Sequence, residues 1–179
     1  NKAFLYESEK YFSDYEKWLS DIRKKDTQLR RIVRYLKAWA DLKRKEMPPG
    51  IVMSILAANN FSENERDDIA LRDALIAIKN DLDTNDFTCI RPTPKVGEDL
   101  FANTPQKDKD YFYNALKAFI DSANMALNNP NQKEACLKWK KYLDDRFPCN
   151  LAKDDIEGSK IYATPPIKND NSKSAKKNE

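Results

Sequence analysis

The apolar residues of this 179-residue chain recur every three or four positions, and the spacing repeats in segment after segment. Residues with this period share one face of an α-helix and bury that face against other helices. Only three glycines interrupt the chain, and alternating strand patterns are scarce. The sequence therefore predicts a mainly α domain, a bundle of about six helices within residues 1–150, followed by an irregular segment and a flexible polar tail over 151–179.

The ends of the expected helices are marked by prolines and polar residues. Pro48 and Pro49 end one helix, because proline lacks the donor N–H and clashes with the preceding turn. Ser62 and Glu65 have the spacing of a capping box, which predicts that a helix begins there. The predicted helices cover about 3–24, 27–45, 50–60, 62–82, 104–128 and 129–145.

A long connection without helical period covers residues 83–104. Its two prolines, its glycine and its several Asn and Asp residues favour irregular structure. A loop of this length in a compact domain is usually functional or packed by its own apolar side chains. We therefore expect a long ordered loop whose inward-facing apolar residues are Phe87, Ile90, Val96, Leu100 and Phe101.

The chain has no histidine and three cysteines, Cys89, Cys136 and Cys149, none of them in a C-x-x-C pair. This composition excludes a Cys–His nucleophile and a Ser–His–Asp triad, and it argues against a zinc site. We expect buried or half-buried thiols in the reducing cytoplasm. No apolar run approaches the ~20 residues of a membrane span, and no signal-peptide core is visible, so we expect a cytoplasmic protein.

Two D-x-D pairs, Asp81/Asp83 and Asp108/Asp110, have the spacing that holds divalent cations in polymerase-type sites. Neither pair follows a Gly-Ser turn or sits on a predicted strand, and both lie at helix ends. Carboxylates near a helix N-terminus commonly stabilise the helix dipole, which fits the second pair. No glycine-rich phosphate loop is present. We therefore expect no metal site and no catalytic residue in this chain.

The basic segment over residues 23–46 is the strongest functional signal. It holds ten Lys or Arg residues and three acidic residues, a local charge of +7. Arg30, Arg34 and Lys37 are separated by four and three positions, so they share one face of the predicted helix. Such a face can bind phosphate groups, or it can be a solvated charged surface whose stems cover apolar residues.

Four stretches carry a resemblance to a known family: LRRIVRYLKAWADLKRKEMPPGIVMSILAAN, RDDIALRDAL, FTCIRPTPKVGEDLF and ACLKWKKYLDDRFP. In this order they resemble the C-terminal helical half of bacterial cyclic-oligonucleotide synthases. These are nucleotidyltransferases related to cyclic GMP-AMP synthase and oligoadenylate synthase, and they act in anti-phage signalling. The resemblance covers roughly residues 20–148, and its Lys-Ala-Trp helix, Cys-x-Arg-Pro loop and Trp…Arg-Phe-Pro end are jointly specific.

The resemblance implies an enzyme that forms a cyclic nucleotide second messenger from nucleoside triphosphates. It implies that Mg²⁺ is bound in an N-terminal catalytic lobe, whose ligands are not in this chain, and that this helical lobe closes the nucleotide cleft and is inactive alone. The partners implied are nucleoside triphosphates, the catalytic lobe and regulatory proteins, with no membrane.

The resemblance also places residues of the triphosphate site. Lys37 matches the lysine that contacts the donor triphosphate in the family, and Arg30 and Arg34 are further candidates on the same helix face. Pro49 stands where the family often has a serine that also reaches the triphosphate, so that hydroxyl contact is missing here. The backbone N–H groups that open the next helix could still bind an anion.

A second interpretation is a stand-alone helical module that binds nucleic acid through its basic helix, and a third is an interaction module that recruits partner proteins through its tail. A basic patch supplies sequence-independent affinity for nucleic acid. The charge is local, however, because the whole chain is +3 and the residues outside the basic segment sum to −4. Few aromatic residues are interleaved with the patch, so base stacking is poorly supported.

Overall fold

The computed structural model describes residues 16–18, 20–21, 27–44, 46–92, 97–147, 149–150 and 152. Within these residues the protein is mainly α, which confirms the predicted fold class, and its only extended pairing is a single β-bridge. The helices are α2 (Thr27–Lys43), α3 (Gly50–Asn60), α4 (Asp67–Thr84), α5 (Gln106–Leu127), α6 (Gln132–Leu143) and the 3-10 helix η1 (Asp144–Arg146). Most of the predicted first helix and the predicted tail lie outside the described residues.

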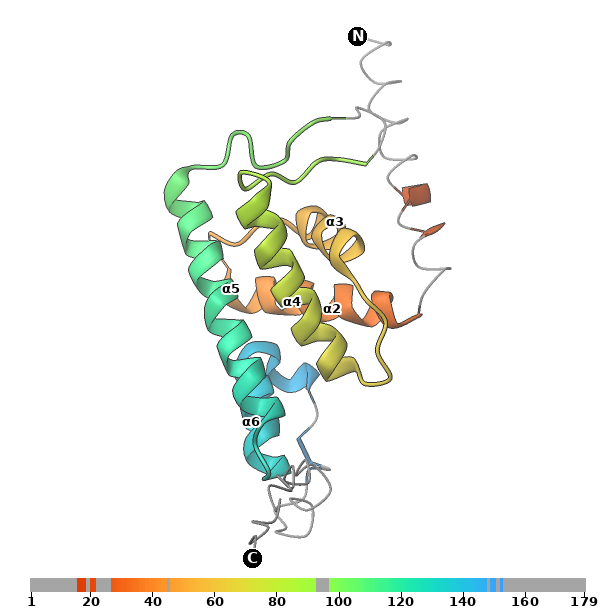
Figure 1. Cartoon of the computed structure of the whole chain (residues 1–179), viewed down its shortest axis with the longest axis vertical. Coiled ribbons are helices and arrows are strands. Elements are labelled where there is room, and N and C mark those ends of the chain that lie inside the picture. The colour runs from red at the N-terminus through yellow and green to blue at the C-terminus, as the bar shows by residue number, and fades with distance from the viewer. Residues whose placement is uncertain are drawn as a thin grey trace, which may run out of the picture.

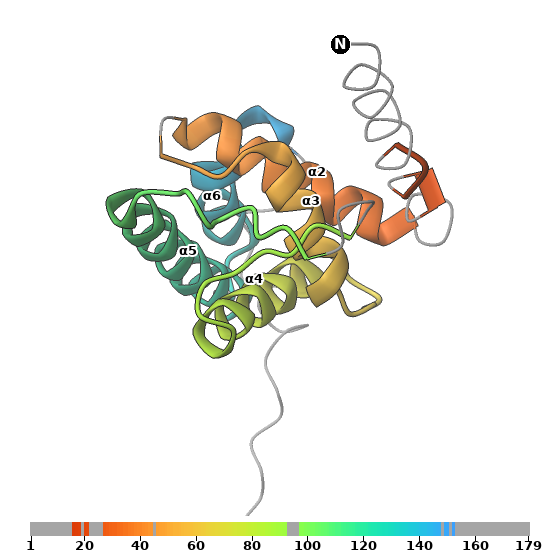
Figure 2. The same ribbon diagram turned by 90° about the horizontal axis from the view of Figure 1, so that it is seen from above.

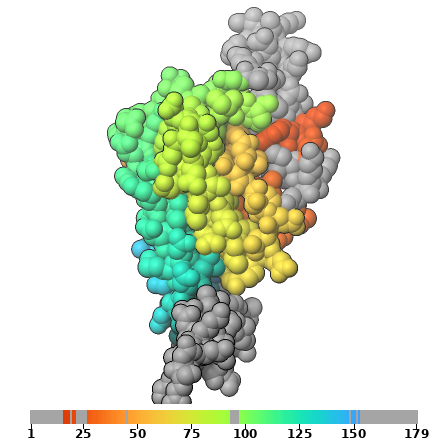
Figure 3. Space-filling model, viewed as in Figure 1, coloured from red at the N-terminus to blue at the C-terminus, as the bar shows by residue number. Residues whose placement is uncertain are grey.

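The helices pack in pairs around a shared interior. Helices α4 and α5 run side by side, and α2 crosses behind them (Figure 1). Helix α3 packs on α2, and α6 packs on α5, as the view from above also shows (Figure 2). In the space-filling view, α4 and α5 cover most of one face of the described part (Figure 3). None of the described helices is long and apolar enough to cross a membrane.

An aromatic cluster joins α2 to α5 and α6. Trp39 of α2 is 1% exposed, and its ring centroid lies 5.1 Å from that of Phe119 on α5. Phe119 also stacks on Tyr142 of α6, with centroids 4.4 Å apart. Since large buried rings contribute most to packing energy, this cluster fixes the position of α2, and therefore of its outward-facing side chains.

The start of α4 differs from the prediction. The helix begins at Asp67 instead of Ser62, and the capping box does not form. The buried side chain of Gln28 on α2 instead bonds both backbone groups of Asn64: its Nε2 donates to the carbonyl at 2.7 Å, and its Oε1 accepts from the N–H at 3.0 Å. These tertiary hydrogen bonds hold Asn64 outside the helix, so α4 starts later.

Arg31 in the basic segment has a structural role. Its guanidinium binds both carboxylate oxygens of Asp67 at the start of α4, with Nη2 2.8 Å from Oδ1. The hydrogen bonds from Arg31 hold the pKa of Asp67 below its usual value. The resulting stabilisation is present above the usual pKa of aspartate and is lost as the pH falls through the lowered pKa of the folded state. Part of the basic charge therefore serves folding.

The connection between α4 and α5 is ordered wherever it is described. Its two halves meet in the antiparallel bridge between Ile90 and Asp99. Phe101 is buried as predicted, and the ring of Phe87 lies 5.0 Å from it. The prediction for Ile90 is wrong, because that side chain is 44% exposed. The neighbouring Cys89 takes the inward position, since successive residues of an extended chain point to opposite sides.

The two other predicted loop residues have different outcomes. Leu100 is half-buried against the core, in agreement with the prediction. Val96 lies outside the described residues.

The cysteines differ in part from the prediction. Cys136 of α6 and Cys149 beyond η1 form a disulfide, with Cα atoms 5.6 Å apart. The expectation of a thiol at each cysteine is therefore wrong for this pair, and cysteine pairing cannot be deduced from spacing alone. Cys89 is a buried thiol, as predicted.

Candidate functional site

An open cavity of about 650 Å³ lies between the end of α2, the start of α3 and η1. Lys37, Arg44 and Arg146 line it, and Asp41 is the single acidic residue of the lining. The charged side chains of the cavity therefore sum to +2, which suits an anionic ligand. The remaining lining residues are Ala40, Met47, Pro48, Pro49 and Gly50.

The side chain of Lys37 crosses the first residue of α3. A methyl group added to Gly50 would lie 3.3 Å from Cε of Lys37 and 3.7 Å from its Cδ. The absence of a side chain at Gly50 thus lets the lysine stem lie close against the helix start. The aromatic cluster around Trp39, two residues further along α2, holds this face of the helix in place. Lys37 is half-buried, in contrast to a freely solvated lysine.

The N-terminus of α3 adds hydrogen-bond donors beside Lys37. Its N-cap residue, Pro49, has an extended backbone and makes no side-chain cap hydrogen bond, and the first turn contains no acidic residue. The first N–H groups of a helix lack partners within the helix and carry partial positive charge. Pro49 removes the serine hydroxyl expected from the resemblance, but these backbone donors remain and can bind an anion.

The structure brings together only some of the residues predicted to bind triphosphate. Lys37 lines the cavity, whereas Arg30 and Arg34 are exposed on α2 and do not line it. Arg30 lies about 10 Å along the helix axis from Lys37, at ~1.5 Å per residue. Sequence reasoning missed Arg44 and Arg146. The arginine of the Arg-Phe-Pro stretch was part of the resemblance, but its place beside Lys37 depends on the folding of α6 and η1.

Both carboxylates of the first D-x-D pair, Asp81 and Asp83, bind other side chains. Asp83 forms an ion pair with Lys79, with 2.7 Å between Nζ and Oδ2, and it accepts a hydrogen bond from the Tyr113 hydroxyl at 2.6 Å. The hydrogen bond from Lys79 lowers the pKa of Asp83. Asp81 accepts a hydrogen bond from the side-chain amide of Asn60 at 3.0 Å. Both carboxylates therefore accept hydrogen bonds from side chains of other helices.

The second D-x-D pair lies at the start of α5. Asp108 is in the first turn, where a carboxylate complements the helix dipole, and Asp110 accepts a hydrogen bond from Gln106 at 2.8 Å. Over the whole part of the chain that the structure describes, no group of three or more Asp, Glu, His or Cys residues could hold a metal ion.

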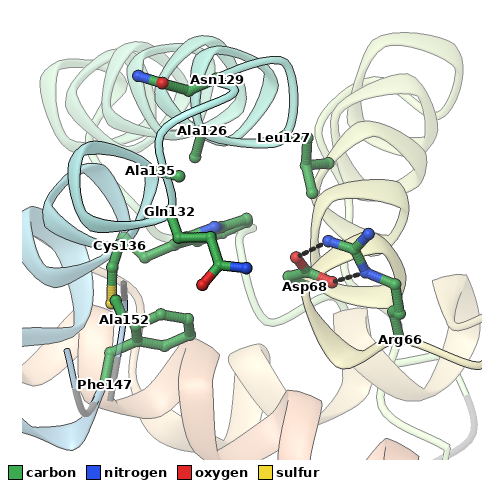
Figure 4. Close-up of a pocket in the computed structure, with 11 residues that line it drawn as sticks. Arg66, Asp68, Ala126, Leu127, Asn129, Gln132, Ala135, Cys136, Phe147 and Ala152 are labelled. Atoms are coloured by element: carbon green, nitrogen blue, oxygen red, sulfur yellow. Dashed lines mark hydrogen bonds and ion pairs between the residues drawn. The ribbon is translucent and has the colours of Figure 1, made fainter. Parts of the chain in front are cut away.

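A smaller cavity of about 310 Å³ lies between the start of α4, the end of α5 and α6. Figure 4 shows Gln132 between α6 and the ion pair of Arg66 and Asp68, whose Nη2 and Oδ2 atoms are 2.6 Å apart. Trp139 and Phe147 line the apolar part. Because its one cation is paired with its one anion, this cavity lacks the net positive charge of the first one.

The cavity between α2, α3 and η1 is therefore the described site with the clearest chemistry. It combines Lys37, a helix N-terminus without acidic residues and two arginines. A comparison with models of known protein families finds none that matches the chain.

Proposed function

We propose that this chain is the helical lobe of a cyclic di- or oligonucleotide synthase of bacterial anti-phage signalling, and that it closes the nucleotide cleft and binds the donor triphosphate. The observation that carries this proposal is the position of Lys37, whose stem crosses Gly50 at the start of α3 in a cavity of net positive charge. The resemblance supports it independently, because the matching lysine of the family contacts the donor triphosphate.

The chemistry of the cavity suits a triphosphate. The ammonium group of Lys37 is a compact charge with three donors, and α3 begins at Gly50, which lines the same cavity. Hydrogen bonds between charged partners are shorter and stronger than neutral ones. Binding at this place would fix the phosphate chain between α2 and α3, where the rigid core beneath both helices limits its movement.

The reaction itself belongs, in this proposal, to an N-terminal catalytic lobe that binds Mg²⁺. This chain supplies binding and orientation of the nucleotide, and we expect it not to turn over ATP or GTP alone. Nucleoside triphosphates, the catalytic lobe and regulatory proteins are the proposed partners, and the cytoplasm is the proposed location.

Lys37→Ala tests the proposal. We expect the affinity of the chain for ATP, measured by isothermal titration calorimetry, to fall about 10- to 150-fold, because one charge-assisted contact contributes about 1.5–3 kcal/mol. In the complete enzyme, product formation should fall with it. The free energy of unfolding should change by less than about 1 kcal/mol, since the lysine ammonium is not part of the core.

Two further variants make the result specific. Lys107→Ala removes the same charge from the exposed first turn of α5 and should leave ATP affinity unchanged. Gly50→Val keeps every charge but places a branched side chain against the Lys37 stem, so affinity should fall. If Lys37→Ala binds ATP like the parent chain, the proposal fails. Salt-dependent binding of single-stranded oligonucleotides that requires Arg30 and Arg34, without ATP binding, would instead favour the helical nucleic-acid module.

A further inference from the structure

Arg44 lines the cavity from the end of α2, and its backbone is in the left-handed region. Its φ is 51°, and its N–H donates to the carbonyl of Ala40 at 2.9 Å, which closes the last turn of the helix. Glycine is the usual residue at this position after a helix, because a side chain makes the left-handed conformation unfavourable. The chain carries an exposed arginine here in spite of that cost, and the residue lines the cavity.

Arg146 lines the same cavity from η1, and its surroundings hold it there. Just before it, Asp145 forms an ion pair with Lys140 of α6, with 2.8 Å between Nζ and Oδ1. Just after it, Phe147 stacks on Trp139, with ring centroids 5.9 Å apart. The disulfide to α6 follows two residues later. The ring contact and the disulfide therefore hold the chain after Arg146 against α6, while Arg146 itself is exposed.

Neither arginine has a carboxylate partner in the described part of the chain. Other described arginines do, such as Arg31 with Asp67 and Arg72 with Asp73. No such ion pair is formed by Arg44 or Arg146 among these residues. The cations of the cavity outnumber Asp41, the one carboxylate of its lining, so an added anion would reduce a net positive charge. A guanidinium offers a planar pair of donors that matches two phosphate oxygens.

We propose that Arg44 and Arg146 are two further phosphate-binding residues, which together with Lys37 make the cavity a site for a chain of linked phosphates. The three cations come from α2, from the residue that follows α2 and from η1, so two segments that lie far apart in the sequence bring positive charge to one cavity. A chain of linked phosphates carries more oxygens and more negative charge than a single phosphate, so it can make more contacts with the three cations and the N-terminus of α3. This inference rests on the proposed function, because it adds two phosphate-binding residues to the same site.

Calorimetric titration of the full chain with sodium tripolyphosphate and with orthophosphate tests the inference. We expect tripolyphosphate to bind the parent chain at least about tenfold more tightly than orthophosphate. Arg44→Gln and Arg146→Gln should each weaken tripolyphosphate binding about tenfold or more, and Arg146→Lys should weaken it less, because the charge remains but the planar fork is lost. Thermal unfolding by circular dichroism checks that each variant is folded.

Arg72→Gln is the control for charge, since it removes one positive charge from α4 at a residue that is paired with Asp73 and does not line the cavity. Unchanged binding by both Arg44→Gln and Arg146→Gln, with loss in Lys37→Ala, would overturn the inference and leave the proposed function standing. Equal weakening in all variants, Arg72→Gln included, would show non-specific attraction and overturn it too. A parent chain that does not bind tripolyphosphate would overturn both proposals.

Discussion

Trp39→Ala is expected to lower the free energy of unfolding by about 3–5 kcal/mol, the usual range for removing a large aromatic side chain from a core. Trp39 is 1% exposed and contacts the rings of Phe112 and Phe119 on α5, at centroid distances of 6.0 and 5.1 Å. Its Nε1 atom is buried with no hydrogen-bond partner in the described structure. The replacement therefore removes packing without breaking a hydrogen bond of the indole.

Urea unfolding followed by circular dichroism measures this effect. Trp39→Phe is the conservative comparison, and it should cost clearly less than alanine, because a phenyl ring fills part of the space and keeps aromatic contacts with α5. A loss below about 1 kcal/mol for alanine would contradict the account, since α2 would then not be anchored by this residue. Lys37 could in that case not be regarded as rigidly placed.

The second large effect concerns the thiol of Cys89. In the folded chain at pH 8, we expect alkylation by iodoacetamide to be about a thousandfold slower than for an exposed cysteine. Burial, followed by the charges of Asp99 and Asp81, raises the pKa of Cys89 from a usual 9.0 to about 12. Only the thiolate reacts with iodoacetamide. A higher pKa leaves a smaller fraction of the thiol ionised at a given pH, so the reaction is slower. The side chain is also only 3% exposed.

Mass spectrometry of the alkylated chain measures this rate without reductant, so that the disulfide stays closed and Cys89 is the reacting thiol. The chain unfolded in urea provides the comparison and should react at the ordinary rate. Rapid and complete modification of the folded chain at pH 8 would show that the thiol is accessible and ionised. Such a result would contradict the buried position that the structure gives to this side chain.

Much of the fold follows from local sequence, and the departures have identifiable tertiary causes. Helix α3 begins after the two prolines and ends at Asn60, as predicted, because proline and the apolar run both act locally. The start of α4 could not be predicted in the same way. Gln28 lies 36 residues before Asn64, and its hydrogen bonds displace a capping box that the local sequence favours.

The residues of the candidate site also differ in whether the sequence alone can predict them. Lys37 could be found from the sequence, because helical spacing and a resemblance both point to it. Arg44 could not be separated from its basic neighbours, since only the backbone conformation at the end of α2 shows which of these residues lines the cavity. Arg146 reaches the cavity through the path of α6 and η1, which helical periodicity does not predict. Arg31, one of the basic residues that share this segment, is used to hold α4.

The most direct test of the central claim is a titration of the isotope-labelled chain with ATP, followed by the amide resonances in two-dimensional NMR spectra. Pro48 and Pro49 have no N–H, so the amides of Gly50 and Ile51 are the first reporters at the start of α3. The account predicts that these two amides and the side chain of Lys37 show the largest shifts. Shifts confined to the Arg30 and Arg34 face of α2, to the smaller cavity beside Trp139, or to no residue at all would contradict it.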